Sequence, residues 1–180
     1  MASGFPINVN GIRIRTSEAL YQICRFPHRT DIQQEIILQR SPMTAKMKSR
    51  RYLIETRKDW EKVRVKVMRW CLQVKLAQNW NSFSSLLFST GDKPIVEESR
   101  KDNFWGAKID DDKTLIGVNA LGRLLMELRA ELRGPNKQQL KRVQPPCFSE
   151  FLIYGHRIDL VEEIDLDPVQ DAQRPLFEIS

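Results

Sequence analysis

Two carboxylates in this 180-residue sequence lie where a charged side chain can be held in place. Glu18 falls in the stretch TSEALYQICRF, which predicts a helix with the glutamate in its first turn. The free amides and the dipole of a helix N-terminus favour negative charge, so we expect Glu18 to be ionised in either a structural or a catalytic role. Asp102 lies in SRKDNFWGAK, three residues before Trp105, where it either acts on a ligand or orders its own loop.

The candidates for ligand contacts are cations, aromatic rings and a glycine. The stretch SPMTAKMKSR supplies Lys46 and Arg50 shortly after a proline, either as phosphate ligands or as solvated charges. Trp60 and Trp105 can stack on a base or a ribose, although Trp60 also fits the apolar face of a long helix. Gly106 relieves the backbone beside Trp105. This set favours an anionic ligand with a part that stacks on aromatic rings.

Together these residue types are what cleavage of a nucleoside-like N-glycosidic bond requires. Carboxylates orient water and stabilise an oxocarbenium-like transition state. Asn119, in GVNALG, can cap a helix whose N-terminus helps to hold a diphosphate. An ionised Glu18 suits water activation or charge stabilisation, which leaves any proton donation to Asp102 or to solvent. Lys46 can grip a phosphate or attack the anomeric carbon to form a transient imine, and both roles stay open.

The charge distribution favours a polyanionic ligand. The sequence has 29 Lys and Arg against 23 Asp and Glu, a net charge of +6. Residues 141–180 contain only four of the basic side chains and eight of the acidic ones, so the positive charge is concentrated before residue 141. A basic body of this kind suits nucleic acid or a phosphate-rich nucleotide, or else only solubility.

We expect no metal, no other cofactor and no membrane partner. The sequence has two histidines and three cysteines, and the cysteines are far apart with no C-x-x-C spacing. No apolar run is long enough to span a bilayer, and the N-terminal residues do not resemble a secretory signal. The prediction is a cytoplasmic protein with reduced thiols.

Hydrophobic periodicity predicts a mainly α protein with a few short strands. A hairpin is expected around Asn10-Gly11, and 91–116 is expected to be loops around one strand, Pro94 to Val96. Helices are predicted over 17–25, 30–40 (capped by Thr30-Asp31), a short stretch from Ser41-Pro42 through Met47, 59–79 and 118–133.

The two long helices are expected to be amphipathic. The first has an apolar face of Trp60, Val63, Val67, Cys71 and Val74 and a basic face of Lys58, Lys62, Lys66 and Arg69; the second has an inner face of Val118, Leu121, Leu125, Leu128 and Leu132.

Five stretches resemble the NADAR (YbiA-like) superfamily in order and spacing, over roughly residues 1–134. They are TSEALYQICRF, SPMTAKMKS, DWEKVRVKVMRWCLQVKLAQN, LLFSTGDKPIVEESRKDNFWG and GVNALGRLLMELR. The resemblance implies a single NADAR-like helical domain with minor β content over residues 1–140. Residues 141–180 match no part of the family and would be an acidic C-terminal appendage, packed on the domain or trailing from it.

The sequence looks most similar to the branch that is paired, as antitoxin, with DNA ADP-ribosyltransferase toxins of the DarT type. This similarity implies an N-glycosidase that removes ADP-ribose from guanine bases in DNA. Ser49-Arg50 departs from the family's usual Gly-Arg, and the sequence starts at or just inside the family's Ser-Asn-Phe-like segment. The positions that match the family's active site are Glu18, Trp60, Asp102 and Trp105, with Lys46 and Asn119 in matching segments.

Three alternatives stay open. Other members of the superfamily cleave a phosphorylated aminopyrimidine nucleotide of flavin synthesis by the same chemistry. From another class, the protein would be a non-catalytic ADP-ribose reader, although the two carboxylates argue against that. As a third alternative, it would neutralise the toxin by direct contact through its acidic tail, Glu150 to Asp171.

Overall fold

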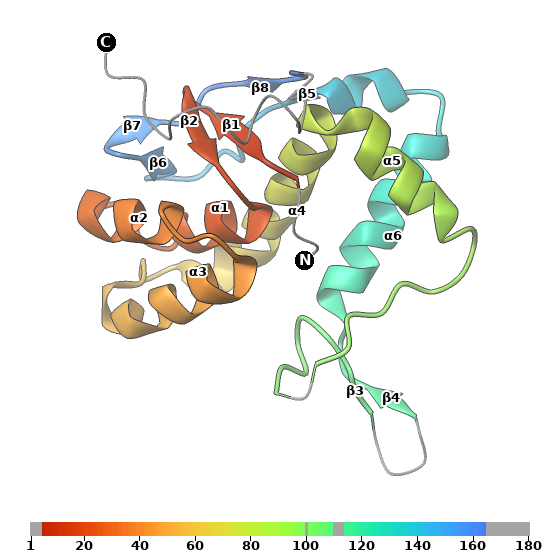
Figure 1. Cartoon of the computed structure of the whole chain (residues 1–180), viewed down its shortest axis with the longest axis horizontal. Helices are drawn as coiled ribbons and strands as arrows, with labels where there is room; N and C mark the ends of the chain where they lie inside the picture. The colour runs from red at the N-terminus through yellow and green to blue at the C-terminus, as the bar shows by residue number, and fades with distance from the viewer. Residues whose placement is uncertain (1–4, 100, 110–113, 165–180) are drawn as a thin grey trace. The chain divides into compact units, whose positions relative to one another are not determined.

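The computed structural model describes residues 5–99, 101–109 and 114–164. Helices dominate and the strands are two or three residues long, which confirms the predicted mainly α fold (Figure 1). The chain forms two compact units. Met1–Trp80 and Gln139–Ser180 make up the first, and Asn81–Gln138 the second. Among the described residues, every helix is too short or too polar to cross a bilayer.

The first unit begins with the predicted hairpin. Strand β1 (Ile7–Val9) pairs antiparallel with β2 (Ile12–Ile14), with Ile7 opposite Ile14. Asn10 and Gly11 both have positive φ, 53° and 76°, as a two-residue hairpin turn requires. The alternating side chains of Ile7, Val9 and Ile14 are buried, so one face of the hairpin is part of the core.

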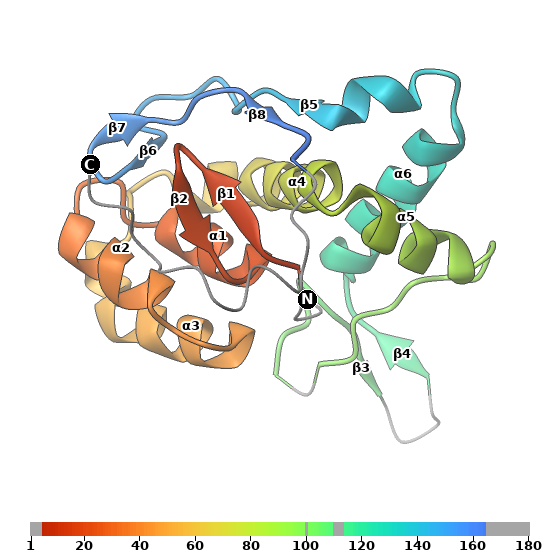
Figure 2. The same cartoon turned by 45° about the horizontal axis from the view of Figure 1, so that its top comes forward.

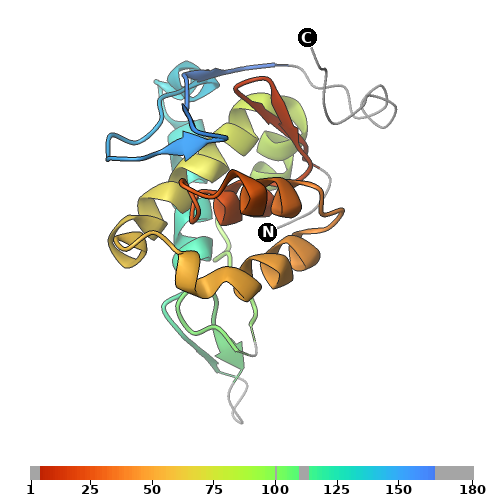
Figure 3. The ribbon, with the colours of Figure 1, turned by 90° about the vertical axis from the view of Figure 1, so that its left-hand side faces the viewer.

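Three helices follow the hairpin. The helix α1 packs against both α2 and α3, and Figure 3 shows α1 and α2 between α3 and the C-terminal strands. The predicted cap of α2 is wrong, because the helix already begins at Thr30 and its N-cap position is Arg29, which makes no side-chain cap hydrogen bond; the Asp31 carboxylate binds the Arg29 guanidinium. The elements are α1 (Ser17–Ile23), α2 (Thr30–Ile37), α3 (Pro42–Ser49) and the 3-10 helix η1 (Arg50–Glu55).

The longest helix, α4 (Trp60–Gln78), is amphipathic as predicted. Its predicted apolar face is buried, and its predicted basic face, Lys58, Lys62, Lys66 and Arg69, is exposed. One cation is an exception: Lys75 is only 2% exposed, with its Nζ 4.2 Å from the centre of the Phe5 ring.

The described part of the C-terminal segment packs on the first unit. Strands β5 (Arg142–Val143) and β8 (Val161–Glu162) pair with each other and contact α4. Strands β6 (Leu152–Ile153) and β7 (His156–Arg157) lie beside the β1–β2 hairpin (Figure 2). Asn10 on the hairpin turn donates to the Arg157 carbonyl at 2.7 Å. The rest of the predicted appendage, 165–180, lies outside the described residues.

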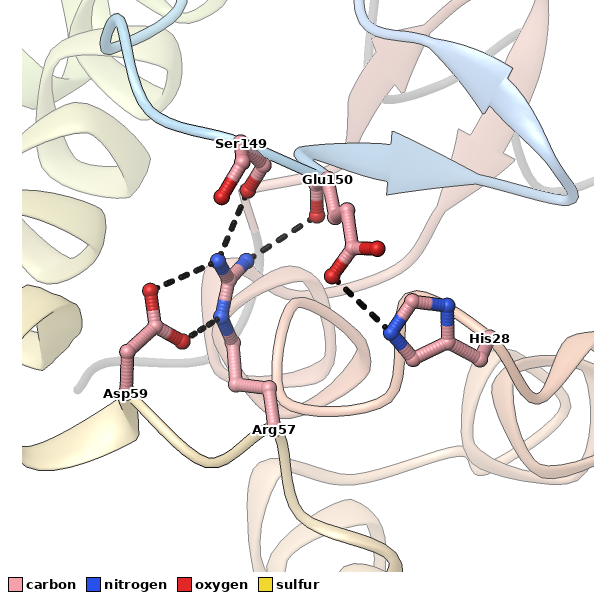
Figure 4. Close-up of polar contacts among 5 residues, drawn as sticks. All are labelled: His28, Arg57, Asp59, Ser149 and Glu150. Atoms are coloured by element: carbon pink, nitrogen blue, oxygen red, sulfur yellow. Dashed lines mark hydrogen bonds and ion pairs between the residues drawn. The ribbon is translucent and has the colours of Figure 1, made fainter.

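Arg57 is one polar anchor of this segment (Figure 4). Its guanidinium donates to the carbonyl oxygens of Ser149, at 2.8 Å, and Glu150, at 3.0 Å, and it lies 5.0 Å from the Phe148 ring. His28 contacts the Glu150 carboxylate at 3.1 Å. The contacts of Arg57 bring the chain around residue 150 back onto the start of α4.

The second unit contains two helices, a strand pair and the loops between them. The expected strand at Pro94–Val96 does not form, because the Ile95 carbonyl accepts a side-chain hydrogen bond instead of a strand partner. Helix α6 starts at Ala120, two residues later than predicted. Val118 therefore lies before the helix and is 44% exposed, so it is not part of the inner face, whereas Leu124 is buried in the core. The 3-10 helix η2 (Lys137–Lys141) includes the last two residues of this unit and the first three of the C-terminal part of the first unit, and β5 follows it directly. The remaining elements are α5 (Trp80–Ser89), β3 (Lys108–Ile109), β4 (Leu115–Ile116) and α6 (Ala120–Arg133).

Candidate functional site

The predicted site residues form two groups, one in each unit. Glu18, Lys46, Arg50 and Trp60 belong to the first unit, and Asp102, Trp105, Gly106 and Asn119 belong to the second.

Glu18 lies in the first turn of α1, as the sequence predicts. Thr16 caps this helix by accepting a hydrogen bond from the Ala19 amide at 3.1 Å. The Glu18 side chain is half-buried, and its Oε1 accepts a hydrogen bond of 2.7 Å from Gln22 Nε2, one helical turn further on. The carboxylate is therefore held both by its place at the helix start and by a specific partner.

Gln22 links Glu18 to two other elements. Its Oε1 accepts a 2.7 Å hydrogen bond from the Ser49 hydroxyl, at the end of α3. It also accepts a 3.3 Å hydrogen bond from Arg25 Nη1. Gln22 and Ser49 are 3% and 0% exposed, so this network is shielded from water. Shielded hydrogen bonds of this kind are costly to leave unmade.

Trp60 is a packed core residue at the start of α4. It is 6% exposed, and its ring lies 5.1 Å from the Tyr21 ring and 5.4 Å from the Arg25 guanidinium. Burial, followed by the charge of Glu18, raises the pKa of the Tyr21 hydroxyl, so this group stays neutral. Burial also lowers the pKa of Arg25. Trp60 thus supports the network around Glu18, and its predicted stacking on a ligand stays a prediction.

Lys46 and Arg50 lie in the C-terminal half of α3 and at its C-cap. Lys46 is half-buried, and its carbonyl oxygen lies 2.9 Å from the Ser49 hydroxyl. Arg50 is exposed. The same serine that contacts Gln22 therefore also contacts the main chain of Lys46.

In the second unit, Asp102 orders the loop that carries Trp105. Its Oδ1 accepts hydrogen bonds from the amides of Phe104, at 3.1 Å, and Trp105, at 2.9 Å. Ser99 in turn accepts from the Asp102 amide at 3.0 Å. The half-buried rings of Phe104 and Trp105 are edge to face, with centres 5.0 Å apart. These hydrogen bonds show that Asp102 orders its own loop. Whether Asp102 also acts on a ligand stays open.

Gly106 is buried where two backbone segments pass close together. A Cβ at this position would lie 2.3 Å from the Glu97 carbonyl oxygen, a distance that real Cβ atoms do not show. The Gly106 carbonyl accepts a hydrogen bond from the Asn119 amide at 3.2 Å. Gly106 therefore has a steric reason to be glycine, in agreement with its predicted relief of the backbone.

Asn119 occupies the N-cap position of α6, in the left-handed conformation with φ 50°. Its side chain does not cap the helix, so that prediction is wrong. Instead its Nδ2 donates to the Ile95 carbonyl at 2.8 Å, and its Oδ1 accepts from the Glu97 amide at 3.1 Å. Asn119 thereby joins the helix start to the 95–97 segment.

The amides at the start of α6 also have partners within the unit. Those of Val118, Asn119, Ala120 and Leu121 donate to the carbonyl oxygens of residues 103, 106, 104 and 105. The loop around Trp105 thus occupies the amides of Ala120 and Leu121, two of the donors that a helix N-terminus offers to an anion. This favours a structural role for the α6 N-terminus over the diphosphate site expected from sequence.

The Glu18 network is the arrangement best suited to chemistry. It holds a half-buried carboxylate in place through a buried amide, which suits stabilisation of positive charge on a substrate. Within 5–99, 101–109 and 114–164, no group of three or more His, Cys, Asp or Glu side chains is placed to hold a metal ion.

The sequence pattern did not single out Gln22 or Arg25, and it marked Ser49 only as a departure from the family's Gly-Arg, not as a contact of Gln22. Gln22 could have been found, since a residue four positions after Glu18 on a helix lies on the same face. The contact of Ser49 could not have been found, because Ser49 lies 27 positions after Gln22 and no local signal marks their contact.

Comparison with known proteins gives matches over most of the chain. Residues 2–133 match the family model described as the NADAR domain. N-glycosidase YbiA of Shigella boydii is 36% identical, over 72% of this chain and 78% of that protein. A riboflavin biosynthesis protein of Vibrio vulnificus is 36% identical over 74% of this chain, which spans only 35% of that relative. The NMR structure of Escherichia coli YbiA matches with a TM-score of 0.60 and 35% identity, over 72% of this chain and 74% of that one.

Proposed function

Since the chain belongs to the NADAR domain family, we propose that it is an N-glycosidase acting on a phosphorylated ribosyl-aminopyrimidine of flavin synthesis. The observation that carries the proposal is the 36% identity to a protein named N-glycosidase, over 78% of that relative. The name of another relative, a riboflavin biosynthesis protein, favours a substrate from that pathway. Together these names support the aminopyrimidine better than ADP-ribosylated DNA.

In the proposed reaction, the bond between the anomeric carbon and the base nitrogen breaks. Water supplies the oxygen that binds the anomeric carbon, and the base nitrogen leaves with a proton. Glu18 would orient this water and stabilise the positive charge that develops on the sugar. Its hydrogen bond from Gln22 supports this role, because it holds the carboxylate in a fixed orientation.

Lys46 has two possible roles in the proposed reaction, and one experiment separates them. As a nucleophile, its amine would attack the anomeric carbon, expel the base and form an imine with the opened sugar, which water then hydrolyses. Borohydride added during turnover would reduce this imine to a stable amine and leave a sugar adduct on Lys46 in mass spectra. If Lys46 only binds phosphate, borohydride would leave it unmodified. The substitution Lys46→Met would then raise KM.

The proposed function is tested by hydrolysis of the ribosyl-aminopyrimidine phosphate, with EDTA present to exclude a contaminating metal enzyme. We expect wild type to release the free base and the sugar phosphate. Glu18→Gln keeps the shape of the side chain and should lose at least about 100-fold in kcat. Glu131→Gln is the matched control on an exposed helix position and should keep full activity. An inactive wild type would contradict the proposal for this substrate.

A second candidate is removal of ADP-ribose from guanine in DNA, as antitoxin to an ADP-ribosyltransferase. The observation that favours it is the exposed basic face of α4, formed by Lys58, Lys62, Lys66 and Arg69, since a short nucleotide does not need such a face. An oligonucleotide with ADP-ribose on guanine tests it directly. Cleavage that falls steeply with salt and weakens in Lys62→Glu would favour DNA. Tight binding without cleavage would favour a non-catalytic ADP-ribose-binding module.

A further inference from the structure

We infer that Gln22 is a positioning residue for the Glu18 carboxylate, and that Ser49 holds the Gln22 amide in the required orientation. This inference rests on the proposed function, because it assigns a catalytic purpose to the contacts of Glu18. Two hydrogen bonds of 2.7 Å carry it, one from Gln22 Nε2 to Glu18 Oε1 and one from Ser49 Oγ to Gln22 Oε1.

The chemistry of the neighbours permits only one orientation of the Gln22 amide. An ionised Glu18 can only accept hydrogen bonds, and the Arg25 guanidinium can only donate them. The amide nitrogen must therefore face Glu18, and the amide oxygen must face Arg25 and Ser49. A reversed amide would place oxygen against the carboxylate and nitrogen against the guanidinium, which loses both hydrogen bonds.

Ser49 couples this orientation to a second helix. Its hydroxyl lies 2.7 Å from Gln22 Oε1 and 2.9 Å from the Lys46 carbonyl oxygen, so the single hydroxyl hydrogen is shared between two acceptors. Through Ser49, the helix that carries Glu18 is connected to the helix that carries Lys46. Because the serine is fully buried, water cannot replace its hydroxyl when it is removed.

The electrostatic surroundings of Glu18 come from three elements. The facing groups are Tyr21 on α1, which stays neutral, and the guanidinium of Arg25, which follows the end of α1. The groups that act on these two or on Glu18 from elsewhere are Arg50 at the end of α3, and Glu61, Arg64 and Cys71 on α4. Among the described residues, the neutral Gln22 side chain hydrogen-bonds to both Arg25 and Glu18, so replacing it by a charged residue perturbs the Glu18 carboxylate directly.

Gln22→Glu tests the positioning role through the pH dependence of kcat/KM. Two carboxylates at hydrogen-bond distance share a proton, so the acidic limb of the profile should move up by about one pH unit or more. At pH 7, kcat should fall about 10- to 100-fold while KM changes less than about threefold, because the ligand contacts remain. Ser49→Ala should lower kcat about 3- to 10-fold, with no new carboxylate and therefore no shift of the acidic limb.

Gln33→Glu is the matched control, because Gln33 is also a fully buried glutamine with both ends of its amide bonded. It should lower stability without moving the acidic limb. A Gln22→Glu profile that coincides with that of Gln33→Glu, once stability is matched, would overturn the positioning role.

A second readout needs no substrate and separates this inference from the proposed function. The side-chain amide resonances of Gln22 in ¹⁵N-labelled protein should shift in Ser49→Ala and in Glu18→Ala, and should not shift in Glu131→Gln. If the Gln22 resonances shift in neither Ser49→Ala nor Glu18→Ala, the inference is overturned even when the enzyme is active. If the wild type is inactive on every substrate but these shifts are seen, the proposed function is refuted. The hydrogen bonds that connect Ser49 through Gln22 to Glu18 would still be supported.

Discussion

Arg57 donates two hydrogen bonds to Asp59, from Nε to Oδ1 at 2.6 Å and from Nη2 to Oδ2 at 3.0 Å. The Asp59 side chain therefore orients Arg57 instead of capping α4, although Asp59 is at the N-cap position. Arg57 is 6% exposed and uses its remaining donors on the carbonyl oxygens of Ser149 and Glu150. The arginine thus joins the start of α4 to the C-terminal segment, and the aspartate keeps it in place.

Asp59→Asn is expected to weaken this anchor in a pH-dependent way. The Arg57 guanidinium holds the pKa of Asp59 below its ordinary value of 3.8. The stabilisation is fully present above that ordinary value and is lost as pH falls through the lower folded-state pKa. Because Asp59 is more than a third exposed, the loss at pH 7 should not exceed about 1 kcal/mol. Urea unfolding at pH 7, 4 and 3 should show wild type and variant converging as pH falls; a constant difference would contradict this.

Much of the fold was predictable because its signals are local. The turn at Asn10-Gly11, the helix after Thr16 and the apolar face of α4 each follow from short-range preferences, and the structure confirms them. Helix α5 was not predicted, because WNSFSSLLFS lacks charged residues to mark a solvent face and contains four serines and one asparagine, which favour turns.

The candidate site was predictable only in part. Glu18 and Asp102 stood out by residue type and local position, and the structure gives both specific hydrogen-bond partners. Asn119 was predicted to cap α6, but its side chain donates a hydrogen bond to the Ile95 carbonyl instead. Such partners come from segments distant in sequence, as does Ser49 for Gln22, and no local pattern encodes them.

Lys75→Met is expected to stabilise the protein at neutral pH. Burial lowers the pKa of Lys75 to about 8, well below its ordinary 10.5, so the folded state pays a penalty for the charged amine below pH 8. Methionine keeps the chain length without the charge, and the gain at pH 7 should be about 1–3 kcal/mol, reduced by the lost contact with the Phe5 ring.

The sign of the pH dependence follows from the lowered pKa of Lys75. Between pH 8 and 10.5 the unfolded chain binds more protons than the folded one, so wild-type stability should rise with pH and the advantage of the methionine should shrink. Chemical unfolding at pH 7 and 10 measures this, with Lys66→Met on the exposed face of α4 as the control. An equal advantage at both pH values would show that the effect is packing and not charge.

Gly106→Ala should disrupt the loop around Trp105. The new Cβ would lie 2.3 Å from the Glu97 carbonyl oxygen and 3.0 Å from the Ser99 Cβ, so the backbone must shift. We expect a loss of about 1–3 kcal/mol, as is typical of overpacking. Asn103→Ala, at an exposed position of the same loop, should cost less than about 0.5 kcal/mol. Thermal unfolding compares the two, and equal stability would mean that the close approach to Glu97 does not constrain residue 106.

Asp102 can be tested for loop order and for chemistry with two substitutions. Asp102→Asn keeps an oxygen that accepts from the Phe104 and Trp105 amides, whereas Asp102→Ala removes it. Both variants lose the charge, so a carboxylate needed for proton transfer or charge stabilisation would make both inactive, with losses of at least about 100-fold in kcat. If Asp102 only orders the loop, the asparagine variant should stay within about threefold of wild type while the alanine variant loses activity. Trp105 fluorescence and amide exchange of residues 103–106 should report a loosened loop in Asp102→Ala alone. A loosened loop in Asp102→Asn as well would mean that the ionised carboxylate, and not merely its oxygen, holds the two amides.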